Sequence, residues 1–458
     1  MRQGLAVVAL VLAAAIMGLP WVLGSQAEAV YEDALAQLQQ QGVRVLDGRY
    51  RRGWFTSDAS VAIELPQSSG QTPVVVPLRL ASEVAHGPWT HGSLRLLPSA
   101  ALIESRLELL IPGIESLPLL LTTRVELNGG GVTRIRLPGL SQQSAALDME
   151  MAEGAGELKF SAGFASVEGG FEIPSLSLSA PEGMRIDLQD LRTSGSGARW
   201  RAGLNTGEGS LSLGRAEVSA PDLSLLAGGL SVTGNAIPDG ELLNMELVYR
   251  VEDLTVNGAV YGASQLSLFL RRLPGEALAS MRQAMQEVTT GAVDESLVAV
   301  AVAAIVAEHL PRLLADDPEL ALERLEISTP EGVVGGRLSI ASQGLTSDDL
   351  ARPVGWVDRL AGEGELSIPR PLLLQLLEGW QYRQVQERLQ QQGLQSPTLP
   401  QGLVKEVAMA AQEQLDSLVG QGWLAEKENT LTVALRLENA LLTVNGKSIP
   451  IGTALAVP

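Results

Sequence analysis

Apolar and polar residues alternate with a period of two in short runs between residues 42 and 273. In 61–65, 175–179 and 210–213, Leu, Val or Ile occupies every second position. Because successive side chains of a strand point to opposite faces, such runs predict strands with one buried face and one wet face. Gly and Pro separate the runs, so we expect about a dozen strands in an antiparallel, meander-like sheet.

Apolar residues at helical spacing replace this alternation in the C-terminal part of the chain. One helix is predicted to begin at Pro274, and a second covers about 294–309. Within the second, 297–307 is wholly apolar but too short to cross a bilayer, so we expect a buried helix packed on the sheet. A third helix is predicted to end at Gly393, and a fourth follows it with one apolar face. Strands are predicted around these helices at 325–327, 337–340, 365–368, 431–437 and 440–445.

The N-terminal segment carries no charged side chain from residue 3 to residue 27, and Arg2 precedes it. Roughly 20 helical residues at about 1.5 Å each span a hydrocarbon core of about 30 Å, so the segment predicts a single membrane-spanning helix. The positive-inside tendency then leaves the N-terminus in the cytoplasm and exports the rest. A cleaved signal peptide is the alternative, because 25–27 and 27–29 offer small residues at the spacing of a cleavage site. A buried core helix is a third.

These patterns divide the chain into three parts. Residues 1–27 are the membrane anchor or signal peptide, 28–273 a β-rich region with a short helix over 29–41, and 274–458 an α+β region with helical segments interleaved with strands. The expected fold class is therefore α+β. It has an N-terminal transmembrane helix followed by a large, predominantly antiparallel β-sheet domain, with helices packed on it in the C-terminal half.

The sequence Leu-Thr-Val-Asn-Gly occurs twice, at 254–258 and at 442–446, each time after a strand-like run. Asn-Gly is a strong signal for a tight turn, because both residues tolerate positive φ. The repetition is either a coincidence in a chain rich in these residue types or the trace of a duplicated unit.

The formal net charge of −19 argues against a nucleic-acid partner, which would require a surplus of Lys and Arg. It also disfavours electrostatic attachment of the domain to anionic headgroups. The chain has no cysteine, which excludes disulfides and thiolate metal sites. The sequence does not indicate the oligomeric state.

Three short motifs resemble the YdgA-like family of uncharacterised bacterial envelope proteins. They are Tyr-Arg-Arg-Gly-Trp-Phe-Thr-Ser at 50–57, His-Gly-Pro at 86–88 and Leu-Thr-Val-Asn-Gly at 442–446. The resemblance implies a location at the bacterial inner membrane, with the bulk of the chain in the periplasm, and a β-rich domain; it implies no reaction. The first motif favours packing inside the protein, and the alternative is an exposed aromatic and Arg patch near the membrane. Candidate partner-contact residues are Arg52, Trp54, Phe55 and His86.

No catalytic, metal-binding or cofactor-binding site is expected. The phosphate-binding and nucleophile motifs of known enzymes are missing from the sequence. His86 and His91 flank a Gly-Pro turn, which predicts a hydrogen-bonded turn more readily than a zinc site. Asp316 and Asp317 before Pro318 predict a helix cap. Acidic pairs at 316–317, 348–349 and 363–365 leave a glycan-directed hydrolase as the alternative.

We therefore expect a non-enzymatic, acidic, membrane-tethered scaffold or binding protein of the periplasm. Its ligand would be lipid or an envelope assembly partner, because the predicted strands have one Leu-rich face, and a curved sheet whose concave face stays apolar could hold acyl chains. The alternative is a periplasmic hydrolase that acts on cell-wall glycan through paired carboxylates. A third possibility is an accessory subunit of an envelope assembly.

Overall fold

The computed structural model describes most of the chain. The described residues are 28, 32, 35, 44–67, 74–87, 99–109, 117–144, 147–181, 183–290, 295–346, 348–349, 355–391 and 401–451. They form two compact units. Unit 1 comprises Met1–Leu226 and Gly275–His309, and unit 2 comprises Ala227–Pro274 and Leu310–Pro458. Each unit is described by itself below.

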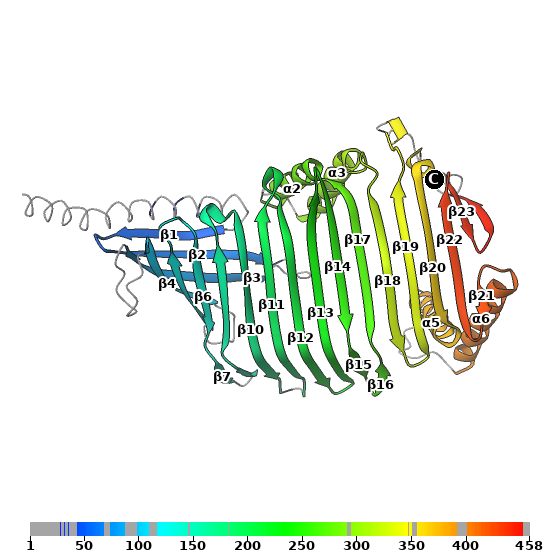
Figure 1. The fold of residues 1–458 in the computed structure, drawn as a ribbon. Coiled ribbons are helices and arrows are strands. Elements are labelled where there is room, and N and C mark those ends of the chain that lie inside the picture. Colours follow the sequence, from blue (N-terminus) through cyan, green and yellow to red (C-terminus); the bar gives the residue numbers. More distant parts are fainter. Residues whose placement is uncertain are drawn as a thin grey trace, which may run out of the picture. The chain divides into compact units, whose positions relative to one another are not determined.

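Unit 1 contains an antiparallel meander, as the alternating runs predict. Strands β1 to β6 pair in chain order. β6 then pairs with β9, and β7 pairs with β8. Both β8 and β9 pair with β10, which is followed by β11 and β12. In Figure 1, β1 to β4 run across the view whereas β10 to β12 run down it, so the sheet of this unit is strongly twisted. The strands are β1 Arg44–Arg52, β2 Thr56–Gln67, β3 Val74–His86, β4 Ala101–Leu109, β5 Leu117–Val125, β6 Gly131–Leu137, β7 Leu140–Gln143, β8 Asp148–Met151, β9 Gly154–Phe160, β10 Ser166–Ser179, β11 Arg185–Arg199 and β12 Asn205–Ala220.

Helices α2 (Gly275–Thr290) and α3 (Glu295–Leu313) follow the strand that ends at Pro274. The helix predicted to be buried corresponds to α3, and that expectation is wrong for one of its faces. Ile305 and His309 are buried, but Val300 is 65% exposed. Many of the other apolar residues of α3 are Ala, whose short side chain exposes little apolar surface. The helix can therefore be apolar along its sequence without being buried on every face.

Unit 2 is also built of antiparallel strands. In it β14 pairs with β13 and β17, and the order continues β18, β19, β20, β22, β23 and β24. The β15–β16 hairpin is inserted between β14 and β17, and β21 pairs with β22. The strands are β13 Leu223–Asp239, which begins in unit 1, β14 Leu242–Val251, β15 Asp253–Val256, β16 Ala259–Tyr261, β17 Ser264–Pro274, β18 Glu319–Thr329, β19 Gly332–Ser342, β20 Leu360–Pro369, β21 Ala425–Lys427, β22 Thr430–Glu438, β23 Leu441–Val444 and β24 Lys447–Pro450.

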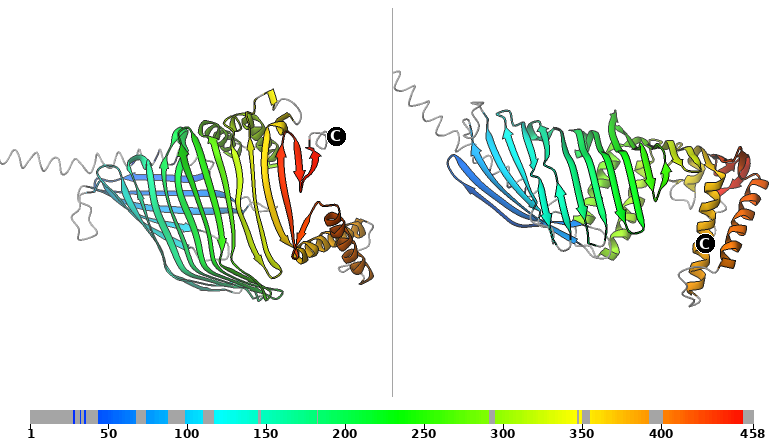
Figure 2. Two further views of the ribbon diagram at one scale, coloured as in Figure 1. Left: turned by 45° about the vertical axis from the view of Figure 1, so that its right-hand side comes forward. Right: turned by 90° about the horizontal axis from the view of Figure 1, so that it is seen from below.

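Helices α5 (Arg370–Gln391) and α6 (Gln401–Gly420) form a helical hairpin that projects from the sheet of unit 2 (Figure 2). The buried stripe of α6 consists of Val407, Ala411 and Leu415, each one turn of helix after the last. The amphipathic face predicted from the sequence is confirmed by this stripe. At the exposed rim of the hairpin, Gln381 donates a hydrogen bond to Gln414 over 2.8 Å.

The two Leu-Thr-Val-Asn-Gly segments fold into the same hairpin, β15–β16 and β23–β24. Asn257 and Gly258 have φ of 49° and 82°, and Asn445 and Gly446 have φ of 46° and 83°, so both turns place positive φ at both central residues. The preceding strands also pair alike. Leu242 of β14 lies opposite Pro274, and Thr430 of β22 lies opposite Pro369. Each proline ends a strand that leads directly into a helix. This correspondence supports the duplication, which stays a prediction.

No helix within the described ranges is both long enough and apolar enough to span a membrane. The predicted anchor, residues 1–27, lies outside the described residues. Of the short helix predicted over 29–41, the structure describes residues 32 and 35, which are helical, as is residue 28 before it.

Candidate functional site

Residues that lie directly opposite one another in an antiparallel sheet share a face, so the strand register defines rows of side chains. In unit 2, three neighbouring rows contain no charged residue, and we call them the apolar face of unit 2. The central row reads Gly234, Leu247, Leu268, Leu322, Leu338, Gly364, Leu435 and Val444. The rows on either side read Tyr249, Leu266, Leu325, Gly336, Leu366 and Val433, and Met245, Leu270, Leu320, Ile340, Gly362, Leu437 and Leu442.

The apolar face of unit 2 is open over much of its area. Six of its large side chains are exposed by between 36% and 50%. They come from five consecutive strands of the sheet order and are Met245, Tyr249, Leu270, Leu320, Leu338 and Leu366. Scattered single apolar residues are normal on protein surfaces, whereas a contiguous apolar area of this kind marks a binding surface.

The opposite face of unit 2 is charged. A hollow of about 500 Å³ on it is lined by side chains that include Arg271, Glu319, Glu323, Arg337 and Glu365. Arg271 pairs with Glu319 over 3.2 Å and also with Glu323, and Arg337 pairs with Glu365 over 3.5 Å. The hydrogen bond that Arg271 donates to the Glu323 carboxylate raises the pKa of Arg271 above its ordinary value. Each of these three carboxylates therefore has an Arg partner.

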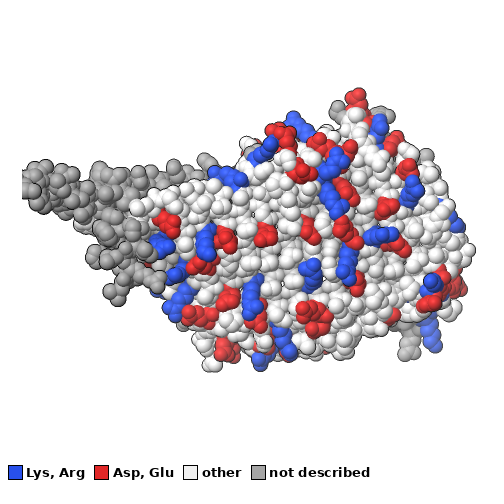
Figure 3. Space-filling view, in the orientation of Figure 1, with Lys and Arg blue, Asp and Glu red and all other residues white. Residues whose placement is uncertain are grey.

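Unit 1 has the same two-faced construction. One row crosses ten strands without a charge and reads Tyr50, Ala59, Ser82, Ser105, Leu121, Ile135, Gly156, Phe171, Thr193 and Leu211. The next row along the strands points to the other face and reads Arg51, Asp58, Glu83, Glu104, Thr122, Arg134, Glu157, Gly170, Ser194 and Ser210. Figure 3 shows one face of the molecule, with basic and acidic side chains interspersed over it.

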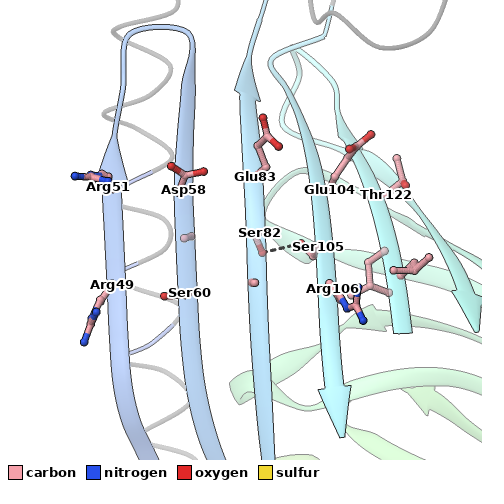
Figure 4. Close-up of a pocket in the computed structure, with 14 residues that line it drawn as sticks. Arg49, Arg51, Asp58, Ser60, Ser82, Glu83, Glu104, Ser105, Arg106 and Thr122 are labelled. Carbon is pink, nitrogen blue, oxygen red and sulfur yellow. Dashed lines mark hydrogen bonds between the residues drawn. The ribbon is translucent and has the colours of Figure 1, made fainter. Parts of the chain in front are cut away.

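A hollow of about 740 Å³ lies on the charged face of β1 to β5. Figure 4 shows Asp58, Glu83 and Glu104 side by side on β2, β3 and β4, beside Arg51 on β1. The register places the three carboxylates directly opposite one another in sequence across the strands. Like charges in such positions cost stability. Among the described residues, no group of three or more His, Asp or Glu side chains is placed to hold a metal ion.

Tyr50, Ser57 and His86 form a buried polar cluster on the uncharged face of β1, β2 and β3. The Oγ of Ser57 lies 2.7 Å from Nε2 of His86, and the two residues are 1% and 3% exposed. Burial raises the pKa of Tyr50, and the neighbouring Ser57 offsets part of that rise. Burial also lowers the pKa of His86, whose Nδ1 has no hydrogen-bond partner among the described residues. Since Ser57 is inaccessible, this Ser-His pair links β2 to β3 and does not present a nucleophile to a substrate.

The motif glycines allow two close backbone approaches around this cluster. The Gly53 N–H donates to the Thr56 carbonyl over 2.9 Å, and a Cβ on Gly53 would lie 2.4 Å from that oxygen. A Cβ on Gly87 would lie 1.8 Å from the Ser99 carbonyl oxygen. Each position therefore requires glycine for steric reasons, whatever the family's function.

A family model described as "Bacterial protein of unknown function (DUF945)" matches residues 2–452. The chain belongs to this family. Protein YdgA of Escherichia coli (strain K12) is 23% identical over 504 residues, which cover 98% of this chain and 95% of that protein. The YdgA-like resemblance seen in the motifs is thus confirmed. No solved structure matches the chain.

The family motifs place the four candidate contact residues in two environments. Trp54 and Phe55 are 53% and 55% exposed in the turn between β1 and β2, and Arg52 forms an ion pair with Glu28 over 3.0 Å. His86 is buried against Ser57 and is therefore out of reach of a partner, which corrects its candidate role. Contact of His86 with Tyr50 and Ser57 was not predicted from the sequence, although all three residues belong to the family motifs at 50–57 and 86–88.

The acidic pairs of the DUF945 chain are used structurally. The sequence predicted that Asp316 and Asp317 cap a helix, and that prediction is wrong. Helix α3 ends at Leu313, and the next element is strand β18, which begins at Glu319. Asp317 instead has a positive φ of 52° and accepts a hydrogen bond from the Gly344 N–H over 2.6 Å. Asp349 is buried and accepts hydrogen bonds from Thr346 and Arg359.

Proposed function

We propose that this chain is a membrane-tethered protein of the bacterial periplasm that binds lipid acyl chains on the apolar face of unit 2. The observation that carries the proposal is the absence of charge from three adjacent rows whose large side chains are exposed across five strands. Burying such a surface is favourable by roughly 25 cal/mol per Å² of apolar area.

An acyl chain fits this face better than a protein surface does. Backbone N–H and C=O groups of a sheet point toward the neighbouring strands, so the face offers an occupant almost no hydrogen-bonding partner. Protein surfaces carry polar groups that would lose hydration there without compensation, whereas an acyl chain carries none. At about 4.8 Å between strands, the central row from Leu247 to Val444 measures roughly 29 Å. That length is about twice the ~15 Å depth of one leaflet of hydrocarbon, so the row is long enough for an acyl chain to lie along it.

The membrane tether is proposed from residues 3–27, whose uncharged, apolar sequence has the length of a membrane-spanning helix. A tether would keep the apolar face near a supply of lipid. A scaffold that binds an envelope protein remains the competing outcome. The hydrolase alternative has less support, because a glycosidase acid needs a raised pKa. The described carboxylates with a resolved shift, Glu153, Asp187 and Asp416, all have a lowered pKa, caused mainly by hydrogen bonds from Arg136, Arg185 and Gln412 respectively.

The test compares two variants on one strand. Leu338→Glu places a charge on the apolar face, and Val333→Glu places the same charge at an exposed apolar position on the opposite face of β19. The full chain and both variants are purified from membranes in mild detergent, and retained lipids and proteins are identified by mass spectrometry. We expect lipid enrichment over a matched membrane control for the parent and for Val333→Glu, and a several-fold loss for Leu338→Glu.

Two results would overturn the proposal: equal lipid retention in all three proteins, or enrichment of a protein partner without lipid. Circular dichroism verifies that each variant is folded. Leu320→Glu provides a second substitution on the apolar face if Leu338→Glu does not fold.

A further inference from the structure

The turn between β1 and β2 exposes two adjacent aromatic side chains in a fixed position. Trp54 and Phe55 stand on a turn closed by the hydrogen bond from the Gly53 N–H to the Thr56 carbonyl. The His86 N–H donates to the Phe55 carbonyl over 2.8 Å, so the backbone below the aromatic pair is tied to β3. The aromatic pair is thus held by a rigid base, and its exposure is a property of the fold.

The strand that leads into this turn is basic in an otherwise acidic chain. β1 has the sequence Arg-Val-Leu-Asp-Gly-Arg-Tyr-Arg-Arg, with four Arg and one Asp, whereas the whole chain has a net charge of −19. The total charge disfavours attachment of the domain to anionic headgroups, but it does not describe this strand. Local charge within a Debye length of about 8 to 10 Å decides such contacts.

An ion pair places the turn beside the end of the predicted membrane helix. Arg52 Nη1 lies 3.0 Å from Glu28 Oε2, and residue 28 is the first charged residue after the apolar segment 3–27. If that segment spans the bilayer, residue 28 emerges at the membrane surface, and the side chain paired with it lies at the same level. Trp54 and Phe55 follow Arg52 by two and three residues.

We infer that the Trp54–Phe55 turn docks into the headgroup region of the bilayer that holds the tether, with Arg51 and Arg52, the β1 residues next to the turn, near anionic headgroups. Trp is enriched at membrane interfaces, where its apolar ring and polar N–H are both satisfied, and Arg is attracted to an anionic membrane surface. The inference rests on the tether of the proposed function but not on acyl-chain binding by unit 2. It gives the exported domain a second contact with the membrane and so restricts its orientation.

The absence of cysteine from the chain permits a site-specific test. Phe55→Cys in the full chain is labelled with an environment-sensitive fluorophore and reconstituted into vesicles of phosphatidylethanolamine and phosphatidylglycerol. Met184→Cys is the matched control, because Met184 is 43% exposed in the turn between β10 and β11, at the opposite end of the strands of the same unit. Lipids that carry a nitroxide at a shallow or a deep position report the depth of each probe, and flotation reports whether the chain remains with the vesicles.

We expect a blue-shifted probe at position 55 that is quenched several-fold more by the shallow nitroxide than by the deep one, and a water-like probe at position 184. Quenching at position 55 should weaken in vesicles of phosphatidylcholine alone. A chain that floats with the vesicles while position 55 stays water-like overturns the docking and leaves the tether standing. A chain that fails to float overturns both. A blue shift that is already present in detergent without lipid also overturns the docking, because the probe would then be covered by protein.

Discussion

The Oγ of Ser57 lies 2.7 Å from Nε2 of His86, across two neighbouring strands and out of contact with solvent. Ser57→Ala would leave that nitrogen buried without its partner, in a ring whose Nδ1 already has none among the described residues. We expect a loss of roughly 1 to 3 kcal/mol in the free energy of unfolding, measured by urea denaturation. Ser196→Ala, at an exposed position of β11, should change it by less than about 0.5 kcal/mol. Equal effects of the two substitutions would contradict a special role for the buried pair.

His86 also predicts a dependence of stability on pH. Burial lowers its pKa below the ordinary 6.5, so the unfolded chain binds a proton at this site more tightly than the folded protein does. As the pH falls below about 6.5, protons therefore favour the unfolded state, and the contribution of His86 to stability is lost. We expect the free energy of unfolding to drop less between pH 7.5 and pH 5 in His86→Gln than in the parent. Parallel pH curves for the two proteins would refute this assignment.

The row of Asp58, Glu83 and Glu104 predicts a substitution that stabilises the protein. Removing the central charge with Glu83→Gln relieves repulsion with both neighbours, worth roughly 0.2 to 1 kcal/mol. The gain should shrink at high salt, because mobile ions screen exposed charges. Glu172→Gln is the control, since Glu172 lies 3.8 Å from Arg192 and loses a weak attraction. A gain that does not depend on salt would point to a cause other than charge repulsion.

The sequence predicted the strands well because alternation is a local property. The run at 175–179 lies within β10, and the amphipathic face of α6 is the one that the spacing of Val407, Ala411 and Leu415 indicates. The apolar face of unit 2 was harder to predict from the sequence, because it depends on the register of the strands. Leu338 and Gly364 share a row only through the pairing of β19 with β20, which no local pattern encodes.

The candidate site was predictable only in part, for the same reason. The motif at 50–57 and the motif at 86–88 were both recognised, and their joint occurrence was the available signal that they meet. Their contact nevertheless depends on the pairing of β2 with β3, so the burial of His86 against Ser57 could not be derived from either motif alone. Exposure of Trp54 and Phe55 likewise follows from the turn geometry and not from their apolar character.

The ion pair between Arg52 and Glu28 provides a final prediction. It tests whether the pair itself positions the Trp54–Phe55 turn or whether only the positive charge of Arg52 matters. Arg52→Glu and Glu28→Arg each place like charges together and should move the aromatic turn away from residue 28. Both single variants should therefore reduce nitroxide quenching of a probe at position 55. The exchange of both charges restores the attraction without altering the net charge of the chain.

We expect quenching in the double variant to return most of the way to the parent value, with a coupling energy of about 0.2 to 1 kcal/mol, because exposed ion pairs are weak. Arg49→Glu is the control, since it changes the net charge as much as Arg52→Glu does but leaves the pair intact. If the double variant stays as weakly quenched as the single variants, the ion pair does not position the turn. The loss would then reflect only the removal of a positive charge at residue 52, which Arg49→Glu should reproduce.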